Sequence, residues 1–416
     1  MNALSNSGAK AMDGRQSLGR ATRSVYLARA LRDFGDGFVA VLLPVYLTSV
    51  GLGEFEVGIV SALALLGSTA MTLGIAFIGS RIDQRTLLIG ASGLMVATGL
   101  AYSVSETYAV ILLVAFVGTV NPSSGSTSIF VPLEHAVLSR SVEDRHRTRM
   151  FARYSLSGAL AAALGALAAA SPDALSAVGV SQLTAIKGMF VAYALLGIAG
   201  GCMYACIPPA ASTTDDRPAT ALGPSRSIVY KMTFLFSIDS FAGGLVVQSL
   251  FALWLFNKFD LSLAAAGAFF FWTGVLSAFS FPVAAWLSSR IGLVNTMVFT
   301  HIPSSVCLIF AAISPNLETA IALLLVRAAL SQMDVPTRSS YVMAVVTPPE
   351  RAATASVTSV GRSLSSAAGP AIAGALFAAG LEAWPLIACG ILKIAYDLAL
   401  LWTFRHVKPP EERHKE

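Results

Sequence analysis

The sequence predicts an all-α integral membrane protein whose twelve transmembrane helices form two pseudo-symmetric six-helix bundles. Three observations predict this fold class. The 416-residue chain is 55% hydrophobic and only 12% charged, which is too little charge to cover the surface of a soluble protein of this length. Twelve apolar segments, most of them about 20 residues or longer, follow one another along the chain. The second half of the chain also repeats features of the first.

The apolar segments are long enough to cross a bilayer as helices. Their even number places both ends of the chain on the same side of the membrane. The fourth and tenth are longer than a bilayer requires, which indicates tilt or an extension beyond it. The segments lie near residues 25–50, 57–79, 86–104, 108–138, 151–170, 185–207, 229–256, 264–288, 293–314, 318–346, 353–379 and 383–404.

Basic residues gather in the loops on the side of the two chain ends. Arg140, Arg145 and Arg217 lie in such loops, whereas the opposite loops carry mainly acidic residues such as Glu54 and Glu106. The positive-inside rule therefore predicts a multi-pass protein of the inner membrane with both termini in the cytoplasm. Residues 1–23 are polar and lack a short apolar core, so they do not look like a cleaved signal peptide.

The two halves of the chain share short motifs. Ser-Arg-Ile follows the second span at residues 80–82 and the eighth at 289–291, and Val-Pro in the fourth span recurs in the tenth. An internal repeat of this size is typical of membrane transporters. The offset between the two Ser-Arg-Ile motifs, about half of the chain, also relates three residue pairs: Gly58 and Gly267, Arg153 and Arg362, and Gly165 and Gly374.

This repeat predicts the domain organisation. The stretch between the two halves is rich in Pro, Ala, Thr and Asp, as expected of a linker. We expect a cytoplasmic tail over residues 1–23, a first bundle over 24–207, a cytoplasmic linker over 208–228, a second bundle over 229–404 and a tail over 405–416.

Twelve spans, two six-helix repeats, a central linker and a short basic loop after the second span together resemble the major facilitator superfamily. In that family the loop reads Gly-x-Leu-Ala-Asp-Arg-x-Gly-Arg-Arg and latches the two halves through charge pairs. Here Arg81 and Arg85 match the family pattern, Ser80 replaces its Asp, and Asp83 stands at its Gly position. The resemblance implies a latch formed by Arg81, Asp83 and Arg85; an ordinary tight turn is the alternative.

The first span carries three charged residues. Arg32 and Asp36 are four residues apart, so they share a helical face and can pair, and Asp33 lies next to Arg32. Charges at membrane depth are expensive and usually face a protein interior or a water-filled cavity. Asp33 and Asp36 are therefore candidates for proton coupling and Arg32 for substrate binding, whereas an ion pair that only fixes helix packing is the alternative.

The resemblance implies a central cavity lined by the first, fourth, seventh and tenth spans, and most remaining buried charges fall on the last three of these. Asp239 is a third proton-coupling candidate, because a buried carboxylate binds protons more readily than an exposed one. Arg327 and Asp334 are substrate-binding candidates. The gating candidates lie toward the cytoplasmic ends, where they form salt bridges or reach the interface: Glu134, Arg338 and Arg362.

No enzyme motif is present: the sequence has no phosphate-binding Gly-rich loop, nucleophile elbow or metal-spaced His cluster. Cys202 and Cys206 share a helical face, but without a neighbouring His or carboxylate we interpret them as packing residues. We therefore expect no enzymatic activity, no cofactor and no metal. The expected partners are a small-molecule substrate, protons and the lipid bilayer, with no nucleic acid, and the expected state is a monomer.

Together these features predict a secondary transporter that moves a small organic solute by alternating access. Proton-coupled efflux is the favoured hypothesis, by analogy with exporters of the same superfamily. Proton-coupled uptake of an organic anion or a sugar is the alternative. A non-transporting membrane sensor on the same fold is a third hypothesis.

Overall fold

The computed structural model describes residues 2–78, 82–123, 128–141, 144–208, 223–347 and 350–404, and none of these residues lies in a β-strand. The helices are α1 (Asn2–Ser49), α2 (Glu54–Ile78), α3 (Gln84–Val104), α4 (Tyr108–Val117), α5 (Phe130–Ser141), α6 (Asp144–Ala168), α7 (Ser171–Ser176), α8 (Gln182–Ala205), α9 (Arg226–Gly244), α10 (Gln248–Phe259), α11 (Leu263–Ile291), α12 (Leu293–Ile313), α13 (Leu317–Ser331), α14 (Asp334–Val345), α15 (Arg351–Ala378) and α16 (Trp384–Phe404).

Each of the twelve expected spans coincides with one long helix or with a broken pair. The pairs are α4 with α5, α9 with α10, and α13 with α14. Pro336 explains the last break, because its ring clashes with the carbonyl of Gln332, where α13 ends. Nine helices or pairs in the described residues are long and apolar enough to cross a membrane. The other three expected spans are α1, α4 with α5, and α15.

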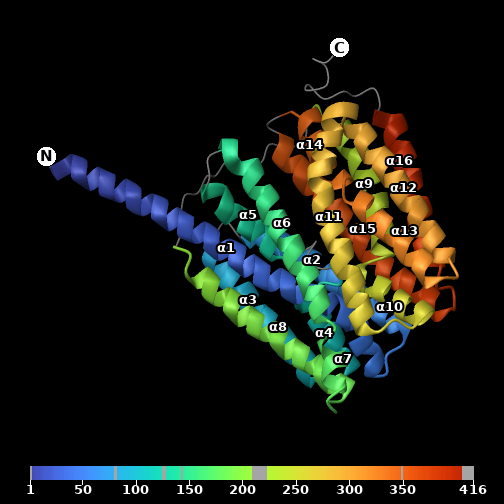
Figure 1. Ribbon diagram of the computed structural model, residues 1–416. Helices are drawn as coiled ribbons and strands as arrows, with labels where there is room; N and C mark the ends of the chain where they lie inside the picture. The colour runs from blue at the N-terminus through green and yellow to red at the C-terminus, as the bar shows by residue number, and fades with distance from the viewer. Residues whose placement is uncertain are drawn as a thin grey trace.

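The helices form two groups that lean together at one end of the molecule (Figure 1). We call one end of the molecule the terminal end: α9 and α15 start there, and α16 finishes there. The opposite end is the distal end. The helices α1 to α8 form the first half and α9 to α16 the second. Figure 1 shows the two halves diverging toward the terminal end. The helix that carries the first expected span, α1, also includes residues 2–23 of the expected tail, and its first part projects beyond the other helices (Figure 1).

Glycines bring the backbones of the two halves together near the distal end. A Cβ atom on Gly58 of α2 would lie 2.5 Å from the Pro370 carbonyl oxygen and 2.8 Å from Gly374 Cα, both on α15. On Gly267 of α11 it would lie 2.5 Å from the Ala166 carbonyl oxygen of α6. The two contacts are related by the repeat, since Gly58 corresponds to Gly267. Small residues at both crossings allow this close approach.

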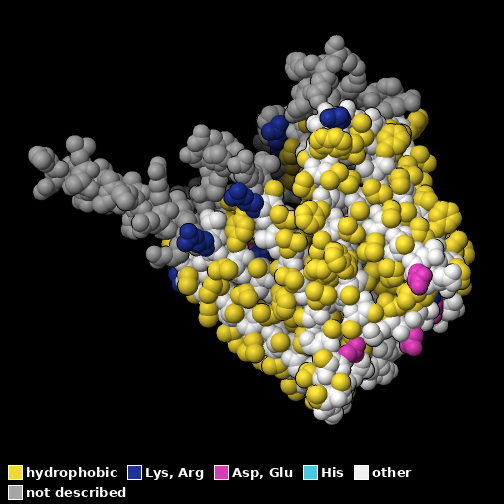
Figure 2. Space-filling view, in the orientation of Figure 1, with side chains coloured by type: hydrophobic (Ala, Val, Ile, Leu, Met, Phe, Trp, Pro, Cys, Tyr) yellow, Lys and Arg dark blue, Asp and Glu magenta, His cyan; other side chains and the backbone are white. Residues whose placement is uncertain are grey.

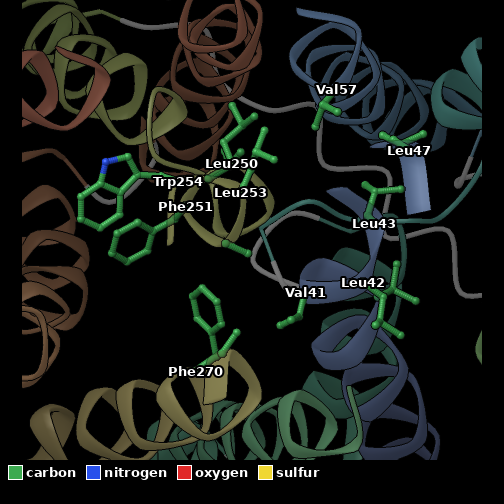
Figure 3. Close-up of a cluster of buried hydrophobic side chains, with 14 of the residues drawn as sticks. Val41, Leu42, Leu43, Leu47, Val57, Leu250, Phe251, Leu253, Trp254 and Phe270 are labelled. Atoms are coloured by element: carbon green, nitrogen blue, oxygen red, sulfur yellow. The ribbon is translucent and has the colours of Figure 1, made fainter. Parts of the chain in front are cut away.

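The hydrophobic core is continuous at the distal end and divided at the terminal end. One buried cluster joins the two halves and includes Leu43 of α1, Val57 of α2 and Leu250 of α10. Figure 3 shows these side chains between the helices. Two further clusters, one around Tyr154 in the first half and one around Tyr341 in the second, are each confined to a single half. The apolar contact between the halves is therefore concentrated at the distal end.

The surface is consistent with a protein that spans a membrane. Figure 2 shows hydrophobic side chains over most of the visible face, with Lys and Arg mostly toward the terminal end and acidic side chains toward the distal end. Exposed large hydrophobic side chains include Trp272, Trp286 and Trp402. An apolar surface of this extent requires lipid as its surroundings.

Glu350 ties together the terminal end of the second half. Its carboxylate accepts hydrogen bonds from Ser225 Oγ at 2.6 Å, from Thr347 Oγ1, and from the backbone amides of Gly223 and Ser225. The hydrogen bonds from Ser225, Thr347 and Gly223 lower the pKa of Glu350 to about 2. The segment before α9 is thereby joined to the connection between α14 and α15.

Replacing Glu350 with Gln is expected to lower the thermal unfolding midpoint at neutral pH, and this difference should shrink as the pH falls. The pKa is lowered in the folded state, so the carboxylate stabilises the protein fully above its ordinary pKa of about 4.3, and this stabilisation is lost as the pH falls through about 2. Unfolding of the detergent-solubilised parent and variant across this acid range measures it. The exposed Glu318→Gln is the control. A pH-independent difference would contradict the prediction.

Candidate functional site

Arg32, Asp33 and Glu134 form a buried charge cluster in the first half. Arg32 Nη1 donates to Glu134 Oε1 at 2.9 Å, and Arg32 Nη2 donates to Asp33 Oδ1 at 3.1 Å. The Glu134 side chain is fully buried and also accepts hydrogen bonds from the hydroxyls of Tyr154 and Tyr204. Helices α1, α5, α6 and α8 therefore meet at one carboxylate. Buried charges in such a site require partners of this kind.

Arg29 belongs to the same cluster, one helical turn before Asp33. Its Nε lies 3.1 Å from Asp33 Oδ2, its Nη1 lies 3.9 Å from Glu134 Oε2, and its guanidinium lies 3.8 Å from the centroid of the Tyr154 ring. Although the charges are close, neither Nε nor Nη1 of Arg29 makes a hydrogen bond within the described residues. Gly158 leaves room for the pair, because a Cβ there would lie 2.2 Å from Asp33 Oδ2.

Asp36 lies apart from these ion pairs. It is 1% exposed and accepts a hydrogen bond at 3.2 Å from the Tyr193 hydroxyl, which in turn lies 3.1 Å from Thr119 Oγ1. The expected pairing with Arg32 is wrong, because Arg32 turns to Asp33 and Glu134 instead. Among the described residues, Asp36 is a buried carboxylate without an ion pair.

The second half holds a comparable cluster around Asp239 of α9. Arg338 Nη1 of α14 lies 2.9 Å from Asp239 Oδ2 and 3.2 Å from Asp334 Oδ2. Lys393 Nζ of α16 lies 2.5 Å from Asp239 Oδ1. Three helices are therefore joined through one carboxylate, as in the first half. Glu134 and Arg338, which follow the repeated Val-Pro motifs, occupy corresponding places with opposite charge.

A histidine extends the second cluster. His301 Nδ1 of α12 lies 3.0 Å from Asp397 Oδ2, and its Nε2 lies 3.4 Å from Lys393 Nζ. Asp397 is fully buried. The chain of contacts thus runs from Asp397 through His301 and Lys393 to Asp239, with every member on a helix of the second half.

The other expected site residues lie elsewhere. Arg362 Nε donates to Ser240 Oγ at 3.1 Å, beside the second cluster. Arg327 is separate from both clusters, with its guanidinium 5.9 Å from the centroid of the Phe251 ring. Arg85 Nη2 donates to the Ala205 carbonyl oxygen at 2.6 Å, within the first half.

Of the expected latch residues, Asp83 and Arg85 lie in the part of the chain that the structure describes. Asp83 directly precedes α3, and Arg81 lies outside the described residues. Glu134 and Arg338 each pair within their own half. The proton-coupling, substrate-binding and gating roles of all these residues stay predictions.

Several residues of the clusters were not among the candidates predicted from the sequence. Lys393 and Asp397 are four residues apart in the last apolar segment, the same signal that directed attention to Arg32 and Asp36. Arg29 and Asp33 have this spacing too. His301 has no charged residue three or four positions away, so it gave no such signal. Tyr154 and Tyr204 gave no signal, since tyrosines at helical spacing are ordinary core residues.

A cavity of about 320 Å³ lies between the two halves. Arg29, Asp33 and Gly158 line it from the first half, and Gln248 and Gln332 from the second. Its other lining residues are Ser123, Ser155, Ala159, Ala162, Ala163, Ala166, Phe270, Thr273, Gly274, Ser277 and Phe281. The volume is within the range typical of small-molecule sites, and the lining mixes apolar, amide, hydroxyl and charged groups.

Solved transporter structures share this architecture. A bacterial homolog of the human lysosomal transporter Spinster, in an inward-facing and unoccupied conformation, superposes with a TM-score of 0.72 at 14% identity, covering 94% of this chain and 97% of that one. The nucleoside transporter NupG superposes with a TM-score of 0.72 at 12% identity, covering 93% and 99%. The human organic anion transporter MFSD10 gives 0.66 at 15%, covering 92% and 99%.

Sequence comparison points in the same direction. An uncharacterized membrane protein of Saccharomyces cerevisiae, YJR124C, is 22% identical over 423 residues, which cover 92% of this chain and 94% of that protein. The family model described as Major Facilitator Superfamily matches residues 25–326 and 229–416. These matches extend over both halves and both charge clusters. The chain therefore belongs to the major facilitator superfamily of membrane transporters.

Proposed function

We propose that this protein is a proton-coupled secondary transporter that carries a small organic solute by alternating access. The observation that carries the proposal is the cavity between the halves, with Asp33 and Arg29 of a buried charge cluster in its wall. A solute site between the halves is what alternating access requires, and titratable groups beside it supply a route for coupling.

The arrangement of the halves supports a cavity that opens on one side. The shared hydrophobic cluster and the glycine contacts close the distal end, whereas the terminal-end clusters are separate. The basic surface near the terminal end supports its placement in the cytoplasm, with the chain in the inner membrane (Figure 2). In this proposal the described conformation is open to the cytoplasm, and the monomer is the working unit.

Asp36 is the proposed proton site that mutation can test most cleanly. It is buried without an ion pair, so neutralising it leaves no cation unpaired. Asp239 instead holds both Arg338 and Lys393, and Asp33 holds Arg29 and Arg32. Changes at Asp239 or Asp33 therefore disturb structure as well as proton binding.

Efflux is the proposed direction, with solute and proton competing for Asp33, the carboxylate of the cavity wall. Co-transport of an organic anion with a proton is a second candidate function. It is favoured by a specific observation: Arg29 lines the cavity and is paired there with Asp33. Protonation of Asp33 would release Arg29 to bind an anion, so that proton and anion would move together.

Replacing Asp36 with Asn is expected to abolish proton-driven accumulation of solute while leaving solute exchange, which needs no net proton movement. Asp33→Asn and Asp239→Asn should lose driven transport too. Flux in reconstituted vesicles, with and without an imposed pH gradient, measures both activities. Glu106→Gln is the control, because its exposed pair with Lys187 lies at the distal surface. Unchanged gradient-driven flux in all three aspartate variants would refute proton coupling.

A further inference from the structure

We propose that the cavity binds an uncharged solute, one that carries several hydroxyl or amide groups beside a planar apolar face. The inference rests on the proposed transport function and names its substrate class, and it counts against the organic anion of the second candidate. Three features of the cavity wall support it: its charges are buried and paired, its free polar groups are neutral, and its remaining surface is apolar.

The charged groups of the cavity wall are mostly buried and already paired. Within the described part of the chain, Arg29 and Asp33 are the only charged residues that line the cavity. Arg29 Nε lies 3.1 Å from Asp33 Oδ2, and the two side chains are only 10% and 4% exposed. Arg32 and Glu134 complete a set of two cations and two anions. An ion entering this cavity would find no unpaired opposite charge, so the loss of its hydration would go uncompensated.

The breaks in three spans bring neutral polar groups to the cavity. Gln248 is the first residue of α10, at the break of the seventh span, and Gln332 directly follows α13, at the break of the tenth. Ser123 lies between α4 and α5, in the break of the fourth span. All three residues line the cavity. The Ser249 amide donates to the Pro122 carbonyl oxygen at 3.1 Å, which joins the fourth and seventh breaks across the two halves.

These neutral side chains are free to bind a ligand. The amides of Gln248 and Gln332 make no hydrogen bond within the described residues. The same holds for the hydroxyls of Ser123 and of Ser155, an exposed residue of α6 that also lines the cavity. Amides and hydroxyls both donate and accept hydrogen bonds, so they match the hydroxyl or amide groups of a solute. A solute hydroxyl can also donate to the Asp33 carboxylate, where it competes with a proton.

The rest of the wall is apolar and sets the shape of the solute. Ala159, Ala162 and Ala163 of α6 line one side, where no side chain extends beyond a methyl group. Phe270 and Phe281 of α11 supply aromatic surface from the other half, and aromatic rings pack well against planar apolar groups. A solute with one flat apolar face and polar groups at its edge therefore matches this wall. The volume of about 320 Å³ limits it to a small molecule.

Binding of phenyl β-glucoside to the purified full chain tests the proposal, because this uncharged probe joins hydroxyl groups to an aromatic ring. The corresponding glucuronide carries a carboxylate, and the corresponding 6-amino sugar carries an ammonium group. Phenylpropanamide, phenylpropanoate and phenylpropylamine form a second set, built on an amide. Calorimetry in detergent gives the affinities. In each set we expect the uncharged member to bind about tenfold more tightly than either charged member. Equal or tighter binding of a charged member in either set, or no binding of the uncharged members, would overturn the proposal.

Two variants locate the binding groups. Gln248→Leu and Gln332→Leu keep a side chain of similar size but lose the amide, so each should weaken binding of phenyl β-glucoside about fivefold, the effect of one hydrogen bond. Neither glutamine makes a hydrogen bond in the described residues, so these changes remove no contact of that kind from the fold. Gln182→Leu, at the exposed first residue of α8 and outside the cavity, is the matched control. Unchanged affinity in both cavity variants would overturn the assignment.

A third variant tests the neutrality of the wall directly. Gln332→Lys adds a cation to the cavity wall, so the preference for the glucoside over the glucuronide should shrink severalfold or reverse. Gln182→Lys is its control, because the same charge then lies outside the cavity. An unchanged preference in Gln332→Lys would place the bound probe elsewhere and overturn the proposal.

These measurements separate the substrate class from the transport proposal. Binding in detergent needs no gradient. Preference for the uncharged probes that depends on the two glutamines, without proton-driven flux in vesicles, would contradict the coupling and leave the substrate class standing. Proton-driven flux of a charged solute, without binding of the uncharged probes, would do the reverse.

Discussion

Replacing Gly58 with Leu is expected to stop transport by preventing the halves from closing at the distal end. The backbone of α15 lies so near that a Cβ on Gly58 would come within 2.5 Å of the Pro370 carbonyl oxygen, closer than Cβ atoms come to other atoms. Overpacking of this kind costs about 1–3 kcal/mol. That penalty applies only to the distally closed state, so it shifts the population of open and closed states by about 5- to 150-fold.

The opening can be measured separately from transport. Ser61 and Ser249 lie in different halves and their hydroxyls are 3.2 Å apart in the closed distal end, where both residues are buried. A cysteine at Ser61, in a chain whose four native cysteines are replaced, should react faster with a membrane-impermeant thiol reagent in the Gly58→Leu background. Gly74→Leu is the matched control, because nothing lies within 4 Å of the Cβ position at Gly74 of the same helix. Normal flux with unchanged labelling would contradict this prediction.

Replacing Glu134 with Leu is expected to destabilise the protein by about 3–5 kcal/mol, the cost of removing one partner from a buried ion pair. Glu134 is the acceptor for Arg32, Tyr154 and Tyr204 at once. Without it, Asp33 alone faces two guanidinium groups, and two buried hydroxyls lose their acceptor. The unfolding free energy in detergent, from thermal or denaturant unfolding, measures the effect.

The control for Glu134 is an ion pair at the surface. Glu106 lies 2.5 Å from Lys187 Nζ, but its side chain is 51% exposed, so Glu106→Leu should cost no more than about 1 kcal/mol. A Glu134→Leu variant that is as stable as Glu106→Leu would show that the cluster contributes little to folding. Retained stability with lost transport would instead assign Glu134 to the transport cycle.

The arrangement of spans could be predicted from sequence because it follows from hydropathy alone. The repeat related Gly58 to Gly267, and the structure places each of them at a close crossing, with α15 and with α6 respectively. The breaks within the fourth, seventh and tenth spans were not predicted. Pro336 marked the last of them, but a proline can bend a helix without ending it.

The partners of the buried charges were harder to predict. Spacing along α1 indicated that Arg32 could pair with Asp36. Tertiary contacts override such local pairs, because Arg32 instead forms an ion pair with Glu134, which is more than one hundred residues away in the sequence. Nothing in the local sequence indicates that Tyr193 lies against Asp36. Lys393 and Asp397 also have opposite charges four residues apart in an apolar segment. Searching every span for this spacing would have located the second cluster.

The separation of the two charge clusters has a consequence for how the membrane voltage acts on the protein. Among the described residues every ion pair joins two side chains of the same half, such as Arg32 with Glu134 and Lys393 with Asp239. When one half tilts against the other, each of these paired cations therefore travels with its own carboxylate. The membrane voltage acts on net charge that crosses the field, at about 2.3 kcal/mol per charge for 100 mV. The ion pairs thus displace little net charge when the empty protein rearranges, so they add little to its voltage dependence.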